Sequence, residues 1–234
     1  MIANELESNG YCILTSVISA DACDRIGCEI TKLLETNKKD SIRAGANSYV
    51  GARNLQQTWT GWREITGTPS IAKLTNSTLG SSAGLVRILF FDKPPGKGWS
   101  LALHKDRTIA VKQHIHPALP FAKPTTKAGV PHVEATTELL ENMLTLRLHL
   151  DSMHYGNGPL MVVPGSHQSV RESSNDATEI HCEVGDVFAM RPLLSHGSRN
   201  AILGNTDHRR VVHLEFAANE SLPGGYEWYQ FSAI

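Results

Sequence analysis

The chain has 234 residues, of which 41% are hydrophobic and 19% are charged, and its 22 Lys and Arg residues nearly balance its 23 Asp and Glu residues. This size fits one β-rich domain, and the balanced charge argues against a nucleic-acid partner, which would need a basic face. The sequence contains neither the roughly 20 consecutive apolar residues of a membrane span nor a basic and apolar secretory signal. We therefore expect a cytoplasmic protein, monomeric or homodimeric, without a nucleic-acid or membrane partner.

The predicted elements begin with a strand over Tyr11–Val17 that leads into a helix. Ser19 is a suitable N-cap for this helix, and its apolar stripe consists of Cys23, Ile26, Ile30, Leu33 and Leu34. From Asn37 to Trp62 the composition is polar and Gly-rich, which predicts a long loop or lid. A short helix is expected next, around Ile71–Asn76.

After Gly84 the pattern changes to short segments of strand-forming residues separated by turn residues. These segments predict strands over Leu85–Phe91, Ser100–Lys105, Leu144–Asp151, Leu160–Val163, Asp186–Met190 and Val211–Ala217. A proline-rich stretch from Pro117 to Pro131 interrupts the series and precedes a short helix expected at Val133–Met143.

The order of these elements, with helices first and many short strands after them, favours a mainly β fold. We expect a double-stranded β-helix, or cupin-like jelly roll, with helices packed on one sheet. The chain is interpreted as one domain over residues 1–234. Its parts are an N-terminal strand and helices in residues 1–83, a barrel core in 84–218 and a C-terminal tail in 219–234.

Alternation along three predicted strands places polar side chains on a common face. Residues i and i+2 of a strand point the same way, so His104 and Asp106 share a face. The next such face carries Thr145, Arg147, His149 and Asp151, opposite four leucines, and the last carries Arg209, His213 and Glu215. Solvent exposure would explain one such face, whereas three of them are consistent with a polar cavity inside a barrel.

His104-Lys105-Asp106, followed much later by His196, has the composition of the facial triad of non-haem iron(II) oxygenases. Two imidazoles and a carboxylate take three adjacent positions of an octahedron and leave three positions for a bidentate oxo-acid and dioxygen. A lone His-x-Asp is common, often as a structural ion pair, so the distal part of the pattern matters. There, Arg209 lies beyond His196 and offers a guanidinium that can bind the far carboxylate of 2-oxoglutarate.

The segment Asn157–His167, with the sequence NGPLMVVPGSH, adds a more specific signal. Together with His104-Lys105-Asp106 and His196-Gly197-Ser198, it resembles the phytanoyl-CoA dioxygenase family, and the likeness covers most of the chain. Some members of the family have Trp and Gln where this chain has Leu103 and Lys105. Neither difference involves a ligand, so we expect it to affect the shape of the pocket.

The resemblance implies a double-stranded β-helix with Fe(II) bound by His104, Asp106 and His196. It also implies that 2-oxoglutarate is anchored by Arg209, with Ser198 assisting. Arg210 is an alternative anchor for 2-oxoglutarate. It is disfavoured because Arg209, and not Arg210, lies on the same face of the strand as His213 and Glu215.

We therefore expect an iron(II)- and 2-oxoglutarate-dependent dioxygenase that hydroxylates an unactivated C–H bond of a small-molecule metabolite, releasing succinate and carbon dioxide. The presence of Asp106 argues against halogenation, because a halogenase needs the coordination position of this carboxylate to be vacant for the halide. Desaturation and cyclisation stay open. A non-catalytic cupin-like binding domain and a mononuclear zinc hydrolase are alternatives from other classes. A shared fold does not identify the substrate.

Further polar residues are candidates for substrate contacts or for structural roles. Arg147, His149 and Arg53 are candidate substrate contacts, and a structural hydrogen-bond network is an equally good account of the first two. His114 and His116 form a His-x-His pair without a nearby acidic or Cys partner, which indicates loop surface more than a zinc site. His167 is interpreted as a turn residue.

Overall fold

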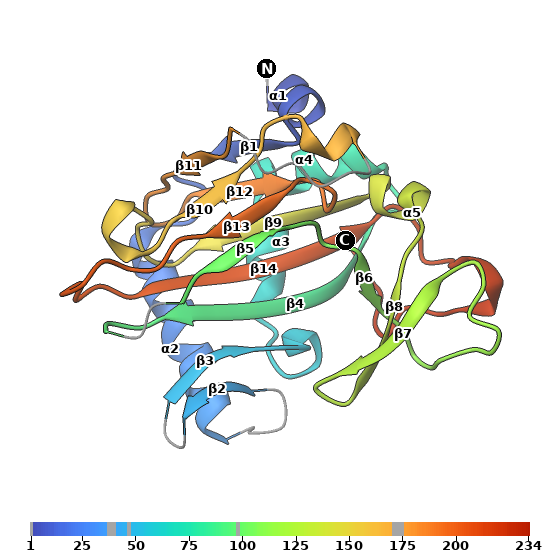
Figure 1. Ribbon diagram of the computed structural model, residues 1–234, viewed down its shortest axis with the longest axis horizontal. Coiled ribbons are helices and arrows are strands. Elements are labelled where there is room, and N and C mark those ends of the chain that lie inside the picture. The colour runs from blue at the N-terminus through green and yellow to red at the C-terminus, as the bar shows by residue number, and fades with distance from the viewer. Residues whose placement is uncertain (1, 37–40, 46–47, 97–98, 170–175) are drawn as a thin grey trace.

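A computed structural model of the protein shows a double-stranded β-helix in which a large antiparallel sheet faces a smaller one (Figure 1). The structure describes residues 2–36, 41–45, 48–96, 99–169 and 176–234. In spatial order the large sheet contains β1 (Tyr11–Leu14), β12 (Val187–Met190), β9 (Met143–His149), β14 (Arg209–Ala217), β4 (Gly84–Lys93), β3 (Ser48–Ala52) and β2 (Ser41–Gly45), and β15 (Ser232–Ala233) pairs with β4.

The smaller sheets complete the barrel and extend it at one end. The facing sheet contains β11 (Thr178–Ile180), β10 (Leu160–Val162), β13 (His196–Ser198) and β5 (Leu101–His104). A third sheet contains β6 (Thr108–Ala110), β8 (Val130–Glu134) and β7 (Ala122–Lys127), and Figure 1 shows it projecting from one end of the barrel. The predicted jelly roll is therefore confirmed.

Helices cover the outer face of the large sheet, as expected (Figure 1). They are α1 (Ile2–Asn9), α2 (Ala20–Thr36), α3 (Trp62–Thr66) and α4 (Pro69–Leu79), with the 3-10 turn η1 (Leu55–Gln57). Helix α5 (Thr137–Glu141) packs in a separate cluster with the third sheet, and the 3-10 turns η2 (Tyr155–Asn157), η3 (Ser166–Gln168) and η4 (Pro223–Gly225) lie in connecting segments. The Ser19 hydroxyl accepts a hydrogen bond from the Ala22 amide, so the predicted N-cap of α2 is confirmed. Among the described residues no helix has the length and apolar character needed to cross a membrane.

Side-chain alternation separates the core from the barrel interior. Leu144, Leu146 and Leu148 on β9 are fully buried against the helices, together with the alternate residues Val212, Leu214 and Phe216 of β14. Burial of each such side chain stabilises the fold by about 1.5–3 kcal/mol. The opposite faces of the same two strands consequently point into the barrel, where they carry polar side chains.

Two predicted segments differ from the structure. The region 37–62, expected as a loop or lid, contains strands β2 and β3, and its residues 37–40 and 46–47 lie outside the described part. Ala52 pairs with Phe90 and is buried in the core, a long-range contact that the local composition does not reveal. The helix expected at Val133–Met143 is limited to α5, because Val133 pairs with Ile109 in the third sheet.

Candidate active site

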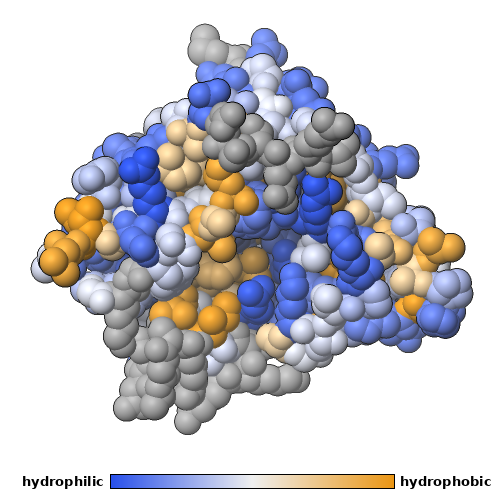
Figure 2. Space-filling model, viewed as in Figure 1, coloured by the Kyte–Doolittle hydropathy of each residue, from blue (hydrophilic) through white to orange (hydrophobic). Residues whose placement is uncertain are grey.

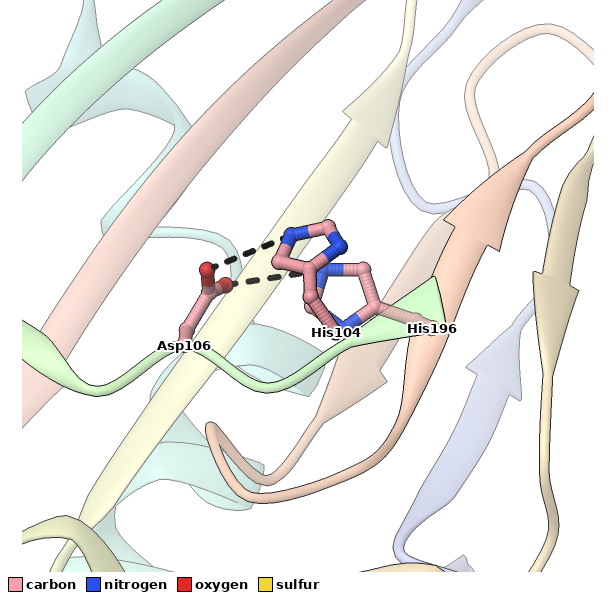
Figure 3. A group of neighbouring side chains, drawn as sticks. All are labelled: His104, Asp106 and His196. Carbon is pink, nitrogen blue, oxygen red and sulfur yellow. Dashed lines mark ion pairs between the residues drawn. The ribbon is translucent and has the colours of Figure 1, made fainter. Parts of the chain in front are cut away.

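Two imidazoles and one carboxylate from distant parts of the sequence meet inside the barrel (Figure 3). His104 ends β5 and His196 begins β13, where the two residues are register partners and their ring centroids are 4.5 Å apart. The Asp106 carboxylate lies 3.8 Å from His104 Nε2 and 3.6 Å from His196 Nε2. One ligand atom from each residue lies within 4.8 Å of the others, so the group can hold a metal ion.

Both imidazoles are oriented by the main chain of their own strands. His104 Nδ1 lies 2.9 Å from the Ala102 carbonyl oxygen, and His196 Nδ1 lies 2.9 Å from the Leu194 carbonyl oxygen. A carbonyl oxygen only accepts, so each Nδ1 carries the proton and each Nε2 presents its lone pair. The Asp106 amide donates to the Pro192 carbonyl at 2.9 Å, which fixes the loop that carries the carboxylate.

The electrostatics of this group favour the protonation states that a metal needs. Desolvation alone would raise the pKa of Asp106, but His196, His104 and two arginines outweigh it and hold the pKa below its usual value. Burial lowers the pKa of His196. An ionised carboxylate and a neutral imidazole are the ligand forms that bind divalent metals.

Two buried guanidinium groups lie on the neighbouring wall of the barrel. Arg209 at the start of β14 is 4% exposed and Arg147 on β9 is 5% exposed. Within the described parts of the chain, neither forms an ion pair, and the Nε atom of each has no hydrogen-bond partner. Burial lowers the pKa of Arg147 to about 10 and that of Arg209 to about 9. Unmatched buried cations are costly, so this wall is suited to an anionic ligand.

Arg210 points to the opposite side of β14 and already has an anionic partner. Its Nη2 lies 2.6 Å and its Nε 2.8 Å from the two carboxylate oxygens of Asp151. The Arg210 amide also donates to this carboxylate, at 2.7 Å. The strand-parity argument against Arg210 as an anchor therefore agrees with the geometry.

Lys93 is a site residue that the sequence reasoning missed. It is 1% exposed, and its Nζ donates to Ser198 Oγ at 3.0 Å, to the Arg199 carbonyl at 2.6 Å and to the Gly158 carbonyl at 3.2 Å. Burial, followed by repulsion from Arg209 and Arg147, lowers its pKa to about 7. Alternation along β4 could have indicated it, because Lys93 has the same parity as Arg87, the other basic residue of this strand.

Two neutral histidines complete this part of the barrel. His149 is fully buried with neither ring nitrogen hydrogen-bonded, and His213 Nε2 also lacks a partner among the described residues. Burial, together with the nearby arginines, lowers the pKa of each well below the usual value of histidine. His213 is the register partner of Arg147, and His196 contributes to its lowered pKa, so an uncharged ring lies near both a guanidinium group and a candidate metal ligand.

The other histidines considered from the sequence, and Arg53, lie outside the group formed by His104, Asp106 and His196. His114 and His116 are exposed in the segment between β6 and β7, and His167 lies in turn η3 with its Nε2 3.0 Å from the Glu7 carbonyl. Among the described residues only His104, Asp106 and His196 form a group with metal-binding geometry. Arg53 is partly buried directly after β3, which joins the sheet of Arg209 through β4.

The sequence and structure comparisons agree with this geometry. Residues 6–210 match the family model for phytanoyl-CoA dioxygenase. The chain belongs to the phytanoyl-CoA dioxygenase family. Its members are oxygenases that depend on iron and 2-oxoglutarate, and the described residues include a group that can hold the metal. No curated protein matches the sequence.

Solved structures of low sequence identity share the fold. The non-heme alpha-ketoglutarate-dependent epimerase SnoN from nogalamycin biosynthesis matches with a TM-score of 0.66 and 19% identity, over 96% of this chain and 89% of SnoN. EctD from S. alaskensis, solved with bound Fe, matches with a TM-score of 0.70 and 18% identity, over 92% and 75% of the two chains. SnoK, a carbocyclase from nogalamycin biosynthesis, has a TM-score of 0.67 and 15% identity, over 94% and 83%. Identities this low establish the architecture and leave the substrate open.

Proposed function

We propose that this oxygenase hydroxylates an unactivated C–H bond of a small-molecule metabolite, with Fe(II) bound by His104, Asp106 and His196. Two imidazole nitrogens and one carboxylate in a compact group are the ligand set of the facial triad. Their Nδ1 hydrogen bonds leave the Nε2 lone pairs available for the metal. The zinc-hydrolase alternative would give the buried guanidinium wall no evident task.

The binding of 2-oxoglutarate is assigned to the buried cations, with Arg209 as the anchor of its far carboxylate. The buried guanidinium of Arg209 carries this assignment, because among the described residues it has no anionic partner and its Nη1 donates to the Met153 sulfur at 3.4 Å. A bidentate pair with a carboxylate would satisfy its free N–H groups and offset the cost of its burial. Ser198 assists through Lys93, which donates to its hydroxyl oxygen at 3.0 Å.

When bound, iron supplies oxygen activation coupled to the oxidative decarboxylation of 2-oxoglutarate to succinate and carbon dioxide. The residues of the chain bind and position the reactants. Arg209 holds the far carboxylate, while His104, Asp106 and His196 would hold the metal. The neutral rings of His149 and His213 line the space between without adding a charge.

Asp106 favours hydroxylation over halogenation, because its carboxylate fills the position that a halide would need. The structural relatives SnoN and SnoK, an epimerase and a carbocyclase, illustrate other outcomes on this fold. A non-catalytic binding domain would have no need of three metal ligands and an unpaired arginine together.

Anaerobic addition of Fe(II) and then 2-oxoglutarate tests the proposal. We expect a visible charge-transfer band to form only when both are present, and succinate to be released slowly after air is admitted. A band without succinate would indicate the binding-domain alternative. No band at all would refute the cofactor assignment.

A further inference from the structure

A second group of cations lies at the other end of the strand pair β4 and β14 from Lys93 and Arg209. Arg87 and Glu215 are register partners on these strands. They lie six residues from the Lys93 and Arg209 pair, which is about 20 Å at the usual rise per residue. Arg87 contacts His132 of β8, and β8 pairs with β6, which begins two residues after Asp106. The candidate metal ligands therefore adjoin this second group of cations, while Arg87 is too distant to share the anchor of 2-oxoglutarate.

Arg87 itself is fully satisfied. Its Nη2 and Nε donate to the two carboxylate oxygens of Glu215 at 2.6 and 2.8 Å, and its Nη1 lies 3.0 Å from His132 Nε2. Because the guanidinium only donates, His132 accepts with Nε2 and donates from Nδ1 to the Val130 carbonyl at 2.9 Å. The negative charge of Glu215 is thereby matched by Arg87.

Arg53 adds a cation to this end of the barrel without a matching anion. It follows Ala52, which is buried on the helix side of the sheet, so strand parity directs Arg53 toward the barrel. Among the described residues its guanidinium has no ion pair. Burial and the nearby charge of Arg87 lower its pKa, while Glu215 and Asp106 oppose that shift.

Lys127 reaches the same region from the third sheet. It precedes the tight turn Ala128-Gly129, in which both residues have positive φ, as the two-residue turn of a β-hairpin requires. Its Nζ donates to Thr108 Oγ1 at 2.8 Å, two residues beyond the candidate ligand Asp106. Lys127 shares a face of β7 with Thr125, the register partner of the His132 that contacts Arg87. In agreement with this placement, burial, Arg87 and Arg53 all lower the pKa of Lys127.

We propose that Arg53 and Lys127 bind an oxyanion, a carboxylate or a phosphate, on the substrate of this enzyme. The proposal deepens the proposed function, on which it rests, by naming the substrate class. With Glu215 matched by Arg87 and Asp106 assigned to the metal, these two cations keep an uncompensated charge. Figure 2 shows a hollow with hydrophilic side chains at its centre on this face of the molecule. An anionic group there would reduce the repulsion and lie beside the metal ligands, where a substrate must be held.

The test uses protein loaded with Ni(II) and N-oxalylglycine, an unreactive analogue of 2-oxoglutarate. The analogue occupies the proposed 2-oxoglutarate site at Arg209, so that other anions cannot bind there. Inorganic phosphate and acetate are titrated separately by calorimetry into the wild type, Arg53→Gln and Lys127→Gln. Lys123→Gln is the matched control, since Lys123 lies on the same strand but is exposed and paired with Glu134.

We expect saturable binding of at least one anion, weakened about 10-fold or more by each site substitution and unchanged by the control. Tighter binding of phosphate would indicate a phosphorylated substrate, and tighter binding of acetate a carboxylate. Absence of binding by the wild type, or equal affinity in the variants, would overturn the proposal. Arg53 and Lys127 lie on separate sheets, so a folding defect in one variant leaves the other as the test. The charge-transfer band is recorded on the wild type, and its absence would instead reject the proposed function.

Discussion

Lys93 and Arg209 are register partners on β4 and β14, and both are almost completely buried. Two neighbouring cations in a dry environment repel each other, and part of the lowered pKa of Lys93 arises from Arg209. A dicarboxylate in the barrel would relieve this repulsion. The unfavourable energy of this repulsion in the free protein would then be offset by ligand binding.

Arg209→Met should weaken the use of 2-oxoglutarate. Loss of two charge-assisted hydrogen bonds is expected to raise the KM for 2-oxoglutarate on the order of 10- to 100-fold. Succinate release at varied 2-oxoglutarate concentration measures the effect. Arg199→Met is the control, because Arg199 is exposed and pairs with Glu179. An unchanged KM in Arg209→Met would remove Arg209 from the site.

Asp106→Ala should abolish hydroxylation by removing the carboxylate ligand. We expect iron affinity to fall by at least about 10- to 100-fold, since even partners in the outer shell of a metal site contribute that much. Iron content after dialysis and the charge-transfer band measure the loss. Asp207→Ala serves as control, because Asp207 is exposed near His154. Full iron retention by Asp106→Ala would be incompatible with the ligand assignment.

Lys93 should make the stability of the ligand-free protein depend on pH. Its pKa is about 7 in the folded state, against 10.5 as the ordinary value, so between these limits the unfolded chain binds more protons. Stability contributed by this residue therefore rises with pH from about 7 upward, by at most about 1.4 kcal/mol per pH unit. Urea unfolding of the wild type and Lys93→Met at pH 7, 8 and 9 isolates the effect. Parallel pH profiles of the two proteins would contradict it.

The Arg87–Glu215 pair should matter for stability. Glu215→Gln leaves a buried guanidinium without its counter-charge, which typically costs about 3–5 kcal/mol. Glu227→Gln removes an exposed partner of Lys112 and should cost less than about 1 kcal/mol. Urea denaturation of both variants compares the two. Equal losses of unfolding free energy in the two variants would show that Arg87 forms another pair or becomes solvated when Glu215 is replaced.

The sequence predicted much of the fold and of the site because strand parity is a local property. Alternation alone indicated the inward faces of β9 and β14, and the spacing of His104, Asp106 and His196 predicted a group that the structure brings together. Contacts between side chains on paired strands could not be predicted from the sequence. The approach of Arg87 to Glu215, or of Lys93 to Arg209, depends on a register between strands more than 100 residues apart.

The strands β2 and β3 were missed for the same reason. Their Gly-rich composition resembles a loop, and only the pairing of β3 with β4 makes them part of the sheet. That pairing also gives Arg53 its place at the barrel, so a region interpreted as a possible lid contributes a fixed wall.

Each ligand imidazole is held by a carbonyl group two residues earlier in its own chain segment. The orientation of the two candidate ligand imidazoles is thus set by main-chain carbonyl groups and not by particular side chains around them. We therefore expect residues of the surrounding walls to tolerate exchange without a change in that orientation. Such a division allows one barrel to acquire new substrates while its oxidative centre stays intact.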